Sequence, residues 1–267
     1  MQAQSIFPGA RAQAGTAFNP TGLIWTLIRT DFKTRYHGTL GGFGWALLKP
    51  LTMFVVLMSV FSFVFVSEPV YRINLILGLF LFDFFAEATK SGFTSMHGKG
   101  YLLTKAKFPS WIVVVTAASN ALITLAILSM VIFSFLVLTG RTPGPGDVLL
   151  YFVYVAAFVL IVTGISLAGS VLFLRYRDLN QVWEVVIQAG FFLAPVIYPL
   201  GIIPERFHFY LYLWPPTPII QFSRSVLVEH AVPSLRAHLL LAMMTMVIFG
   251  SGVAIFKRYA PRAAEYL

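Results

Sequence analysis

Two acidic residues within an apolar stretch of the chain, Asp83 and Glu87, are the residues best placed to do chemistry. They lie four positions apart, so on a helix their carboxyl groups share one face. An ionised carboxylate is costly in apolar surroundings unless it is paired or hydrated. The pair therefore suggests a proton or ion relay. The more ordinary interpretation is that each carboxylate pairs with a cation on a neighbouring helix or faces water.

Other catalytic and ligand-binding signatures are missing from the sequence. It contains no G-x-x-x-x-G-K-[ST] segment that would cradle ATP and no G-x-S-x-G nucleophile motif. Its five histidines are dispersed without the spacing of metal ligands, and it has no cysteine for thiol chemistry, disulfides or metal binding. Glu205 with His208 is a thin acid–base candidate. We predict no catalytic site, no bound cofactor and no metal in this chain.

The composition indicates a membrane protein. Hydrophobic residues make up 58% of the chain and charged residues only 11%, with a mean hydropathy of +0.82. Several charge-free runs reach the roughly 20 apolar residues that a helix needs to cross the bilayer core. The net charge of +9 would suit nucleic acid, but the cations lie in short segments between apolar runs. That pattern fits membrane orientation better.

We predict an all-α integral membrane protein with six transmembrane helices. A flexible cytoplasmic lead occupies residues 1–22, where Pro and Gly discourage regular structure, and residues 23–267 form a single transmembrane domain. The six spans are expected at about 47–67, 73–90, 110–139, 148–173, 182–199 and 237–256.

Three segments outside the spans have a predicted structure of their own. Residues 24–37 form a basic amphipathic helix in the membrane interface, and residues 91–108, which carry lysines but no acid, form an inner loop with a short helix. Residues 200–236 hold several prolines, so we predict two short helices, about 204–214 and 217–229, in a re-entrant hairpin on the outer side. The apolar stripe of the interfacial helix consists of Trp25, Ile28, Phe32 and Tyr36.

The distribution of cations sets the predicted orientation. An even number of spans puts both termini on one side, and 14 of the 19 Lys and Arg residues lie on that side. Because cytoplasmic segments are enriched in Lys and Arg, we expect both termini in the cytoplasm.

Aromatic residues at helical spacing are candidates for the lining of a passage. Such stripes usually face lipid or pack in a core. The functional interpretation is a conduit whose ring faces stack on sugars and whose phenols exchange hydrogen bonds with hydroxyls. In the fourth span, Gly164 and Ala168 allow helices to approach closely, more often within one chain than between two. The candidate lining residues are Phe54, Phe61, Phe65, Tyr151, Tyr154, Phe158 and Tyr198.

The order of several short motifs resembles that of a known family. Two positions depart from the family's usual pattern. Thr39 stands where Ser is more usual, and Pro215 stands where Asn is more usual. Together these motifs are similar to those of type-2 ABC exporter permeases for polysaccharides, the membrane subunits that export O-antigen, capsule or teichoic acid. The similar segments are Arg29-x-Asp31, Arg35-Tyr36, Thr39-Leu40-Gly41, Trp45, Pro50, Leu102-Leu103-x-Lys105-x-Lys107-Phe108-Pro109, Arg175-Tyr176-Arg177-Asp178-Leu179, Pro195-Val196-Ile197-Tyr198, and Pro215-Pro216-Thr217-Pro218 through Arg224.

The resemblance covers nearly the whole chain and implies a homodimeric permease in the inner membrane. Its implied partners are two copies of a cytoplasmic ATP-binding subunit, which holds ATP and Mg, and a lipid-linked polysaccharide, O-antigen in the first place. No nucleic acid is implied. The loop at 91–108 would hold the coupling helix that docks on the ATPase, and the outer hairpin would act as a gate.

Two sets of residues follow from the resemblance. The implied ATPase-subunit interface consists of Arg29, Lys33, Arg35, His97, Lys99, Tyr101, Leu102 and Lys105. The implied outer gate consists of Tyr210, Trp214, Pro215, Phe222 and Arg224.

Three alternative functions are compatible with the sequence. An ion-coupled secondary carrier would use Asp83 and Glu87 and would lose transport entirely when both acids are replaced. A transferase acting on lipid-linked sugars would depend on Glu205 and His208. An ABC permease for drugs or small lipids would share the six-span plan.

Overall fold

The computed structural model of the chain describes residues 20–38, 41–65, 70–105 and 108–265. Regular secondary structure within these ranges is entirely helical. The predicted lead lies almost wholly outside the described residues, and so do Thr39, Leu40 and Lys107 of the family motifs.

The described part of the chain contains eleven α-helices and two short 3₁₀ segments, Leu200–Ile202 and Ala260–Glu265. The α-helices are α1 (Pro20–Tyr36), α2 (Gly44–Phe61), α3 (Tyr71–Gly98), α4 (Gly100–Lys105), α5 (Trp111–Ala117), α6 (Ser119–Leu138), α7 (Pro145–Arg175), α8 (Leu179–Leu193), α9 (Glu205–Tyr212), α10 (Pro216–Leu227) and α11 (Leu235–Tyr259).

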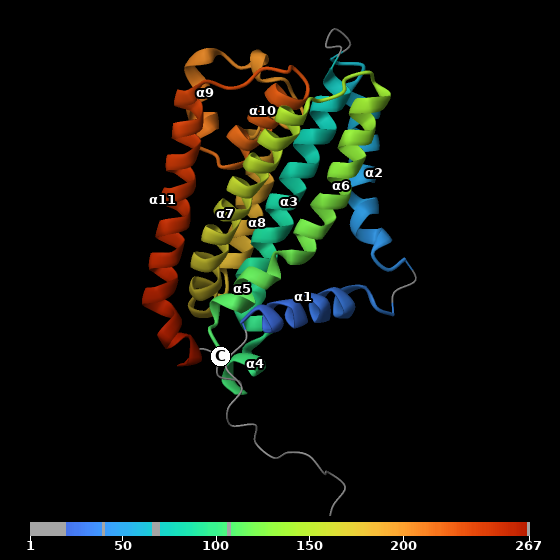
Figure 1. Cartoon of the computed structure of the whole chain (residues 1–267). Coiled ribbons are helices and arrows are strands. Elements are labelled where there is room, and N and C mark those ends of the chain that lie inside the picture. Colours follow the sequence, from blue (N-terminus) through green and yellow to red (C-terminus); the bar gives the residue numbers. More distant parts are fainter. Residues whose placement is uncertain (1–19, 39–40, 66–69, 106–107, 266–267) are drawn as a thin grey trace, which may run out of the picture.

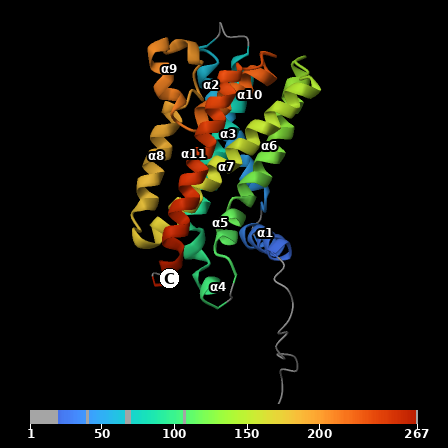
Figure 2. The same cartoon turned by 60° about the vertical axis from the view of Figure 1, so that its left-hand side comes forward.

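The long helices stand side by side as a bundle, which Figures 1 and 2 show from two directions. α1 runs across the lower end of this bundle with α4 below it, and α9 lies at the upper end (Figure 1). α3 and α7 pack against each other at the centre, α11 packs on α7, and α2, α6 and α8 pack on α3. We call the end with α1 and α4 the lower end and the opposite end the upper end.

α3 is central because its sequence is apolar on every side. Consecutive residues from Leu75 to Phe82 are all buried, although successive positions on a helix point in different directions. A helix that is hydrophobic all round needs neighbours on all sides. α2, α6, α7, α8 and α10 provide them.

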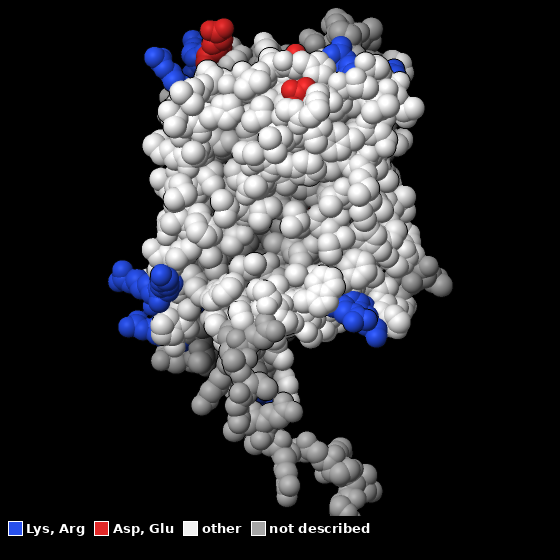
Figure 3. Space-filling model, viewed as in Figure 1, with Lys and Arg blue, Asp and Glu red and all other residues white. Residues whose placement is uncertain are grey.

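Among the described residues, four helical segments are long and apolar enough to cross a membrane: Gly44–Phe61, Trp111–Leu138, Pro145–Arg175 and Leu235–Arg262. On the face shown in Figure 3, Lys, Arg, Asp and Glu gather near the two ends, and the surface between them is free of charge. A bilayer core requires such a belt, because a charge there is expensive. The prediction of an all-helical membrane protein is confirmed, and the number of crossings stays a prediction.

The structure differs from the predicted boundaries at several places. α2 ends at Phe61, before the predicted end of the first span near residue 67. α3 continues to Gly98, so residues 91–98 are helical rather than part of a loop. The physical reason is packing on α7, since Gly92 lies against Ser166 and the ring of Phe93 lies against Gly169. α8 ends at Leu193, well before the predicted end of the fifth span at residue 199. Pro195 explains this early end, because proline disfavours helical backbone at the residue before it.

The central helix α7 and the outer helix α11 approach each other closely at two glycines. A Cβ atom at Gly164 would lie 2.7 Å from the backbone oxygen of Ile248, and a Cβ atom at Gly252 would overlap the carbonyl group of Gly164. Small residues allow this kind of close packing between membrane helices. The predicted interpretation of Gly164 as a packing position within one chain is confirmed.

Candidate functional site

α1 is held at the lower end by part of its predicted apolar stripe. The ring of Tyr36 lies 4.9 Å from the ring of Phe32 and 5.1 Å from that of Phe43, centroid to centroid, and Leu27 is buried. α1 packs on α5 and α6. Trp25, at the start of the predicted stripe, is 67% exposed. The amphipathic helix therefore uses Phe32 and Tyr36 for contacts with its own chain.

In the part of the chain that the structure describes, four ion pairs connect charged residues of α3, or the residue that follows it, to α1, α2 and α8. The pair between Asp31 on α1 and Lys99 at the end of α3 has its nitrogen and oxygen 2.5 Å apart, and both side chains are 21% exposed. The loosest joins α2 to α3 across 3.5 Å. The four pairs are Asp31–Lys99, Arg35–Glu87, Lys49–Asp83 and Lys90–Glu184.

Asp83 and Glu87 thus each have a cationic partner on another helix. This confirms the more ordinary interpretation of the two carboxylates. The pKa of the Arg35 guanidinium is raised: burial lowers it, but the hydrogen bond and the negative charge of Glu87 more than offset that effect.

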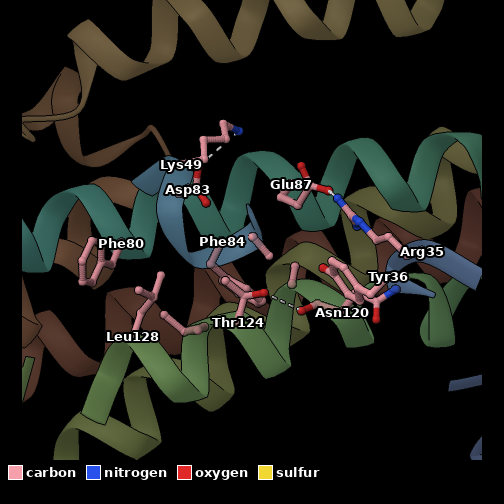
Figure 4. Close-up of a pocket in the computed structure, with 13 residues that line it drawn as sticks. Arg35, Tyr36, Lys49, Phe80, Asp83, Phe84, Glu87, Asn120, Thr124 and Leu128 are labelled. Carbon is pink, nitrogen blue, oxygen red and sulfur yellow. Dashed lines mark hydrogen bonds and ion pairs between the residues drawn. The ribbon is translucent and has the colours of Figure 1, made fainter. Parts of the chain in front are cut away.

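A small polar pocket of about 50 Å³ lies behind these pairs, between α1, α2, α3 and α6 (Figure 4). Thr124 on its wall donates a hydrogen bond to the backbone oxygen of Asn120 over 3.0 Å. The side-chain oxygen of the buried Asn120 has no protein partner. The pocket has room for a few water molecules, which would satisfy that oxygen and hydrate the neighbouring charges.

The eight residues implied for an ATPase interface all lie on α1, near the end of α3 or on α4, at the lower end of the bundle. Tyr101 is 72% exposed, and Lys105 donates a hydrogen bond to its hydroxyl over 2.8 Å. Lys99 and Leu102 are half-buried. The other exposed members of the set are Arg29, Lys33, Arg35, His97 and Lys105.

A large groove runs between α2 and α8 with α3 as its floor, and its volume is about 810 Å³. Its wall on α2 follows helical spacing through positions 45, 48, 49, 52, 53 and 56, and the floor on α3 through 79, 82, 83 and 86. The lining is mostly apolar. The groove residues are Trp45, Leu48, Lys49, Pro50, Thr52, Met53, Val56, Leu79, Phe82, Asp83, Ala86, Ile187, Gln188, Phe191 and Phe192.

None of the seven residues predicted to line a passage is among those that line this groove. Tyr151, Tyr154 and Phe158 are fully buried in the core of one chain. The hydroxyl of Tyr151 lies 2.8 Å from that of Ser129, and the hydroxyl of Tyr154 lies 2.8 Å from Nε2 of His238. Within one copy of the chain, the hydroxyl groups of both tyrosines therefore form hydrogen bonds with other side chains.

The other four predicted lining residues lie elsewhere. Phe54 is buried on the opposite side of α2, edge-on to Phe80 and Phe135. Phe61 and Phe65 stack on each other near the end of α2, and the hydroxyl of Tyr198 donates to the backbone oxygen of Phe192 over 2.9 Å. Sequence reasoning did not select the groove aromatics Trp45, Phe82, Phe191 and Phe192. Of these, Trp45 alone had a spacing signal, since it lies four residues before Lys49.

The residues implied for an outer gate divide between the surface and the interior. Tyr210 on α9 is 62% exposed. Trp214 and Pro215 are half-buried, with Trp214 edge-on to Phe85. Phe222 and Arg224 on α10 are buried.

Arg224 connects three parts of the upper half of the bundle. Its guanidinium donates hydrogen bonds to the backbone oxygens of Asn74 on α3 (2.6 and 3.0 Å), Pro195 (2.6 Å) and Val196 (3.0 Å). The last two oxygens belong to the non-helical segment that follows α8. Buried backbone oxygens need such donors, so Arg224 supports the unwound backbone there.

The acid–base candidate on α9 is not assembled. His208 lies 2.8 Å from the backbone oxygen of Ile203, and Glu205 on the same helix is exposed. The residues that the structure describes contain no group of three or more His, Asp or Glu side chains able to hold a metal ion.

These features define a class of protein: a helical integral membrane protein with an apolar groove along its bundle and a basic, aromatic lower end. The sequence model of the ABC-2 type transporter family matches residues 22–228, and the chain belongs to that family. The predicted family membership is thereby confirmed.

The alignments with three named relatives cover most of the chain. It is 27% identical to the O-antigen export system permease protein RfbA of Myxococcus xanthus, over 91% of this chain and 95% of the relative. It is 25% identical to the protein of the same name in Klebsiella pneumoniae, over 92% and 95%. It is 21% identical to the polysialic acid transport protein KpsM of Escherichia coli, over 88% and 92%.

Proposed function

We propose that the chain is the permease subunit of an ABC exporter that moves lipid-linked polysaccharide across the inner membrane, with O-antigen as the favoured substrate. The proposal rests on one observation above all: relatives named for O-antigen export match more than nine-tenths of the chain. The match with a polysialic acid transport protein supports a polysaccharide over a drug or a small lipid.

In this proposal the chain crosses the membrane six times, through α2, α3, α5 with α6, α7, α8 and α11. The lower end and both termini face the cytoplasm, and α9 and α10 form a re-entrant hairpin at the outer side. Two features support α3 and α8 as crossings. The acidic residues Asp83 and Glu87 of α3 are paired, and the unwound backbone after α8 is satisfied by Arg224, as irregular backbone at membrane depth must be.

We propose that two copies of a cytoplasmic ATP-binding subunit dock at the lower end, against α4 and α1. Energy must come from such a partner, because the sequence contains no P-loop for ATP. ATP and Mg would be held by that subunit. The exposed Tyr101 supports this docking position, since tyrosines are enriched among the residues that dominate interface affinity.

The proposed passage forms between two copies of the chain, with the groove of each copy facing the other. Trp45, Phe82, Phe191 and Phe192 would then line it with aromatic rings. Ring faces suit sugars, because they contact C–H groups while hydroxyls bond elsewhere. Tyr198 would lie beside this lining through its contact with Phe192.

The ion-coupled carrier is the weaker proposal. It requires Asp83 and Glu87 to exchange ions or protons, and both carboxylates have cationic partners on α2 and α1. Membership of the ABC-2 type transporter family favours ATP as the energy source.

The experiment that tests the function reconstitutes the chain with its ATP-binding partner in lipid vesicles. We expect lipid-linked polysaccharide to reach the vesicle interior only when both subunits and ATP are present, as measured by protection of the sugar from an added glycosidase. ATP hydrolysis by the purified chain alone would contradict the proposal. So would transport driven by an ion gradient without ATP.

Replacing Tyr101 with alanine will weaken binding of the ATP-binding subunit by at least about tenfold, because loss of a central interface tyrosine costs about 2 kcal/mol or more. Binding is measured by titrating the partner onto the chain in lipid nanodiscs. Thr104→Ala on the same helix is the matched control, since Thr104 is also exposed. Equal affinities of Y101A and T104A would exclude Tyr101 from the contact.

A further inference from the structure

We infer that Lys49 and Asp83 form a binding site for sugar hydroxyls within the groove. The inference rests on the proposed function and assigns a substrate contact to the same site. The ligand class is an uncharged portion of a carbohydrate chain.

The two side chains lie where the wall of the groove meets its floor. Lys49 comes from α2 and Asp83 from α3, and both line the groove as well as the small polar pocket behind it (Figure 4). Apart from this pair, Thr52 and Gln188 are the polar side chains among the fifteen groove residues. The pair is therefore the one charged position on an otherwise mostly apolar path.

The separation of the pair leaves each side chain able to take a further hydrogen-bonding partner. Nζ of Lys49 and Oδ1 of Asp83 are 3.5 Å apart, beyond the usual 2.7–3.2 Å range of a hydrogen bond. The Asp31–Lys99 pair at the lower end is closed to 2.5 Å. Lys49 is 73% exposed, so its ammonium faces open space. Of the four ion pairs around α3, the one in the groove is the open one.

A hydroxyl group fits between these two partners. It accepts a hydrogen bond from an ammonium and donates one to a carboxylate, which Lys49 and Asp83 offer side by side. Hydrogen bonds with a charged partner are about twice as strong as neutral ones. Because the two charges cancel, the pair attracts neither anionic nor cationic polymers and suits a neutral sugar.

An aromatic ring flanks this site on α2. Trp45 lies one turn before Lys49 and is 61% exposed, whereas Phe82, which precedes Asp83 on the floor, is buried against Phe191. A ring face beside hydroxyl-binding groups is the combination that carbohydrate recognition needs, because a sugar presents C–H faces and hydroxyl edges. The groove thus provides both contacts within about one helical turn.

The test uses the reconstituted complex of the chain and its ATP-binding partner, with lipid-linked polysaccharide purified from the cells that produce this protein. We expect Asp83→Asn and Lys49→Met each to raise the KM for the polysaccharide by about tenfold, as loss of one charge-assisted hydrogen bond predicts. K49M folds even if D83N does not, since Lys49 is largely exposed.

The matched control is the pair Lys90–Glu184, which also joins α3 to a neighbour but does not line the groove. K90M and E184Q should leave the KM unchanged. An unchanged KM in both K49M and D83N, with wild-type transport intact, would overturn the inference alone. A wild-type complex that hydrolyses ATP but moves no polysaccharide would overturn the proposed function and the inference together.

Discussion

Replacing Arg224 with methionine will destabilise the folded chain by about 3–5 kcal/mol, the range found when one member of a buried charged interaction is removed. Arg224 is only 4% exposed, and its guanidinium donates to three backbone oxygens, those of Asn74, Pro195 and Val196. Methionine fills much of the volume but has no donor. Each orphaned oxygen then carries a desolvation penalty of about 1–3 kcal/mol, most fully at Pro195 and Val196, where the hydrogen bonds to Arg224 are buried.

The measurement is the unfolding midpoint of the purified chain in detergent, followed with hydrogen exchange over α10. Arg206→Met is the matched control, since Arg206 on α9 is exposed and its guanidinium lies over the ring of Phe207 at 4.8 Å. R206M should change stability by less than about 0.5 kcal/mol, as most surface substitutions do. Similar stabilities for R224M and R206M would show that Arg224 does not support the unwound segment.

Arg224 was placed in the implied outer gate by the order of the family motifs. The motif marks the residue as special but gives no contact. Its partners lie 150, 29 and 28 residues away along the chain. No local pattern connects a guanidinium to backbone oxygens at those distances. The unwound segment itself follows from Pro195, which sequence does provide.

The general fold was predictable because the bilayer imposes simple rules. Long charge-free runs must be helices that satisfy their own backbone groups, and this places α2, α6, α7 and α11 near their expected positions. Likewise Pro215 and Pro216 separate α9 from α10 where two short helices were expected. The extension of α3 was not predictable from polarity, since Phe93 and Met96 are buried against parts of the chain far away in sequence.

The groove was harder to predict than the helices that form it. α2 is apolar on nearly all sides, so Phe54 and Trp45 were equally plausible as markers of the functional face. Tertiary packing decides between them, because Phe54 faces Phe80 and Phe135 while Trp45 lines the groove. For the same reason Tyr151 and Tyr154, which suggested a passage, bond instead to Ser129 and His238, residues that their own helix does not contain.

Replacing Gly252 with leucine will separate α11 from α7 and destabilise the chain by about 3 kcal/mol, the upper part of the usual range for overpacking. A side chain at this position meets the carbonyl group of Gly164, which is backbone and cannot rotate away. The two helices must therefore move apart along their contact. That movement removes dispersion contacts on both sides, which are the main source of packing energy between membrane helices.

Gly250 is a matched control on the same helix, two residues away. A Cβ atom there meets nothing within 4 Å, and the residue is exposed. G250L should therefore leave stability unchanged or raise it by up to about 0.8 kcal/mol, because leucine is the better helix former. Unfolding of the two variants in one detergent separates a steric effect from a change in hydrophobicity, since each adds the same side chain. If G252L unfolds at the same midpoint as G250L, α7 and α11 do not meet at their glycines.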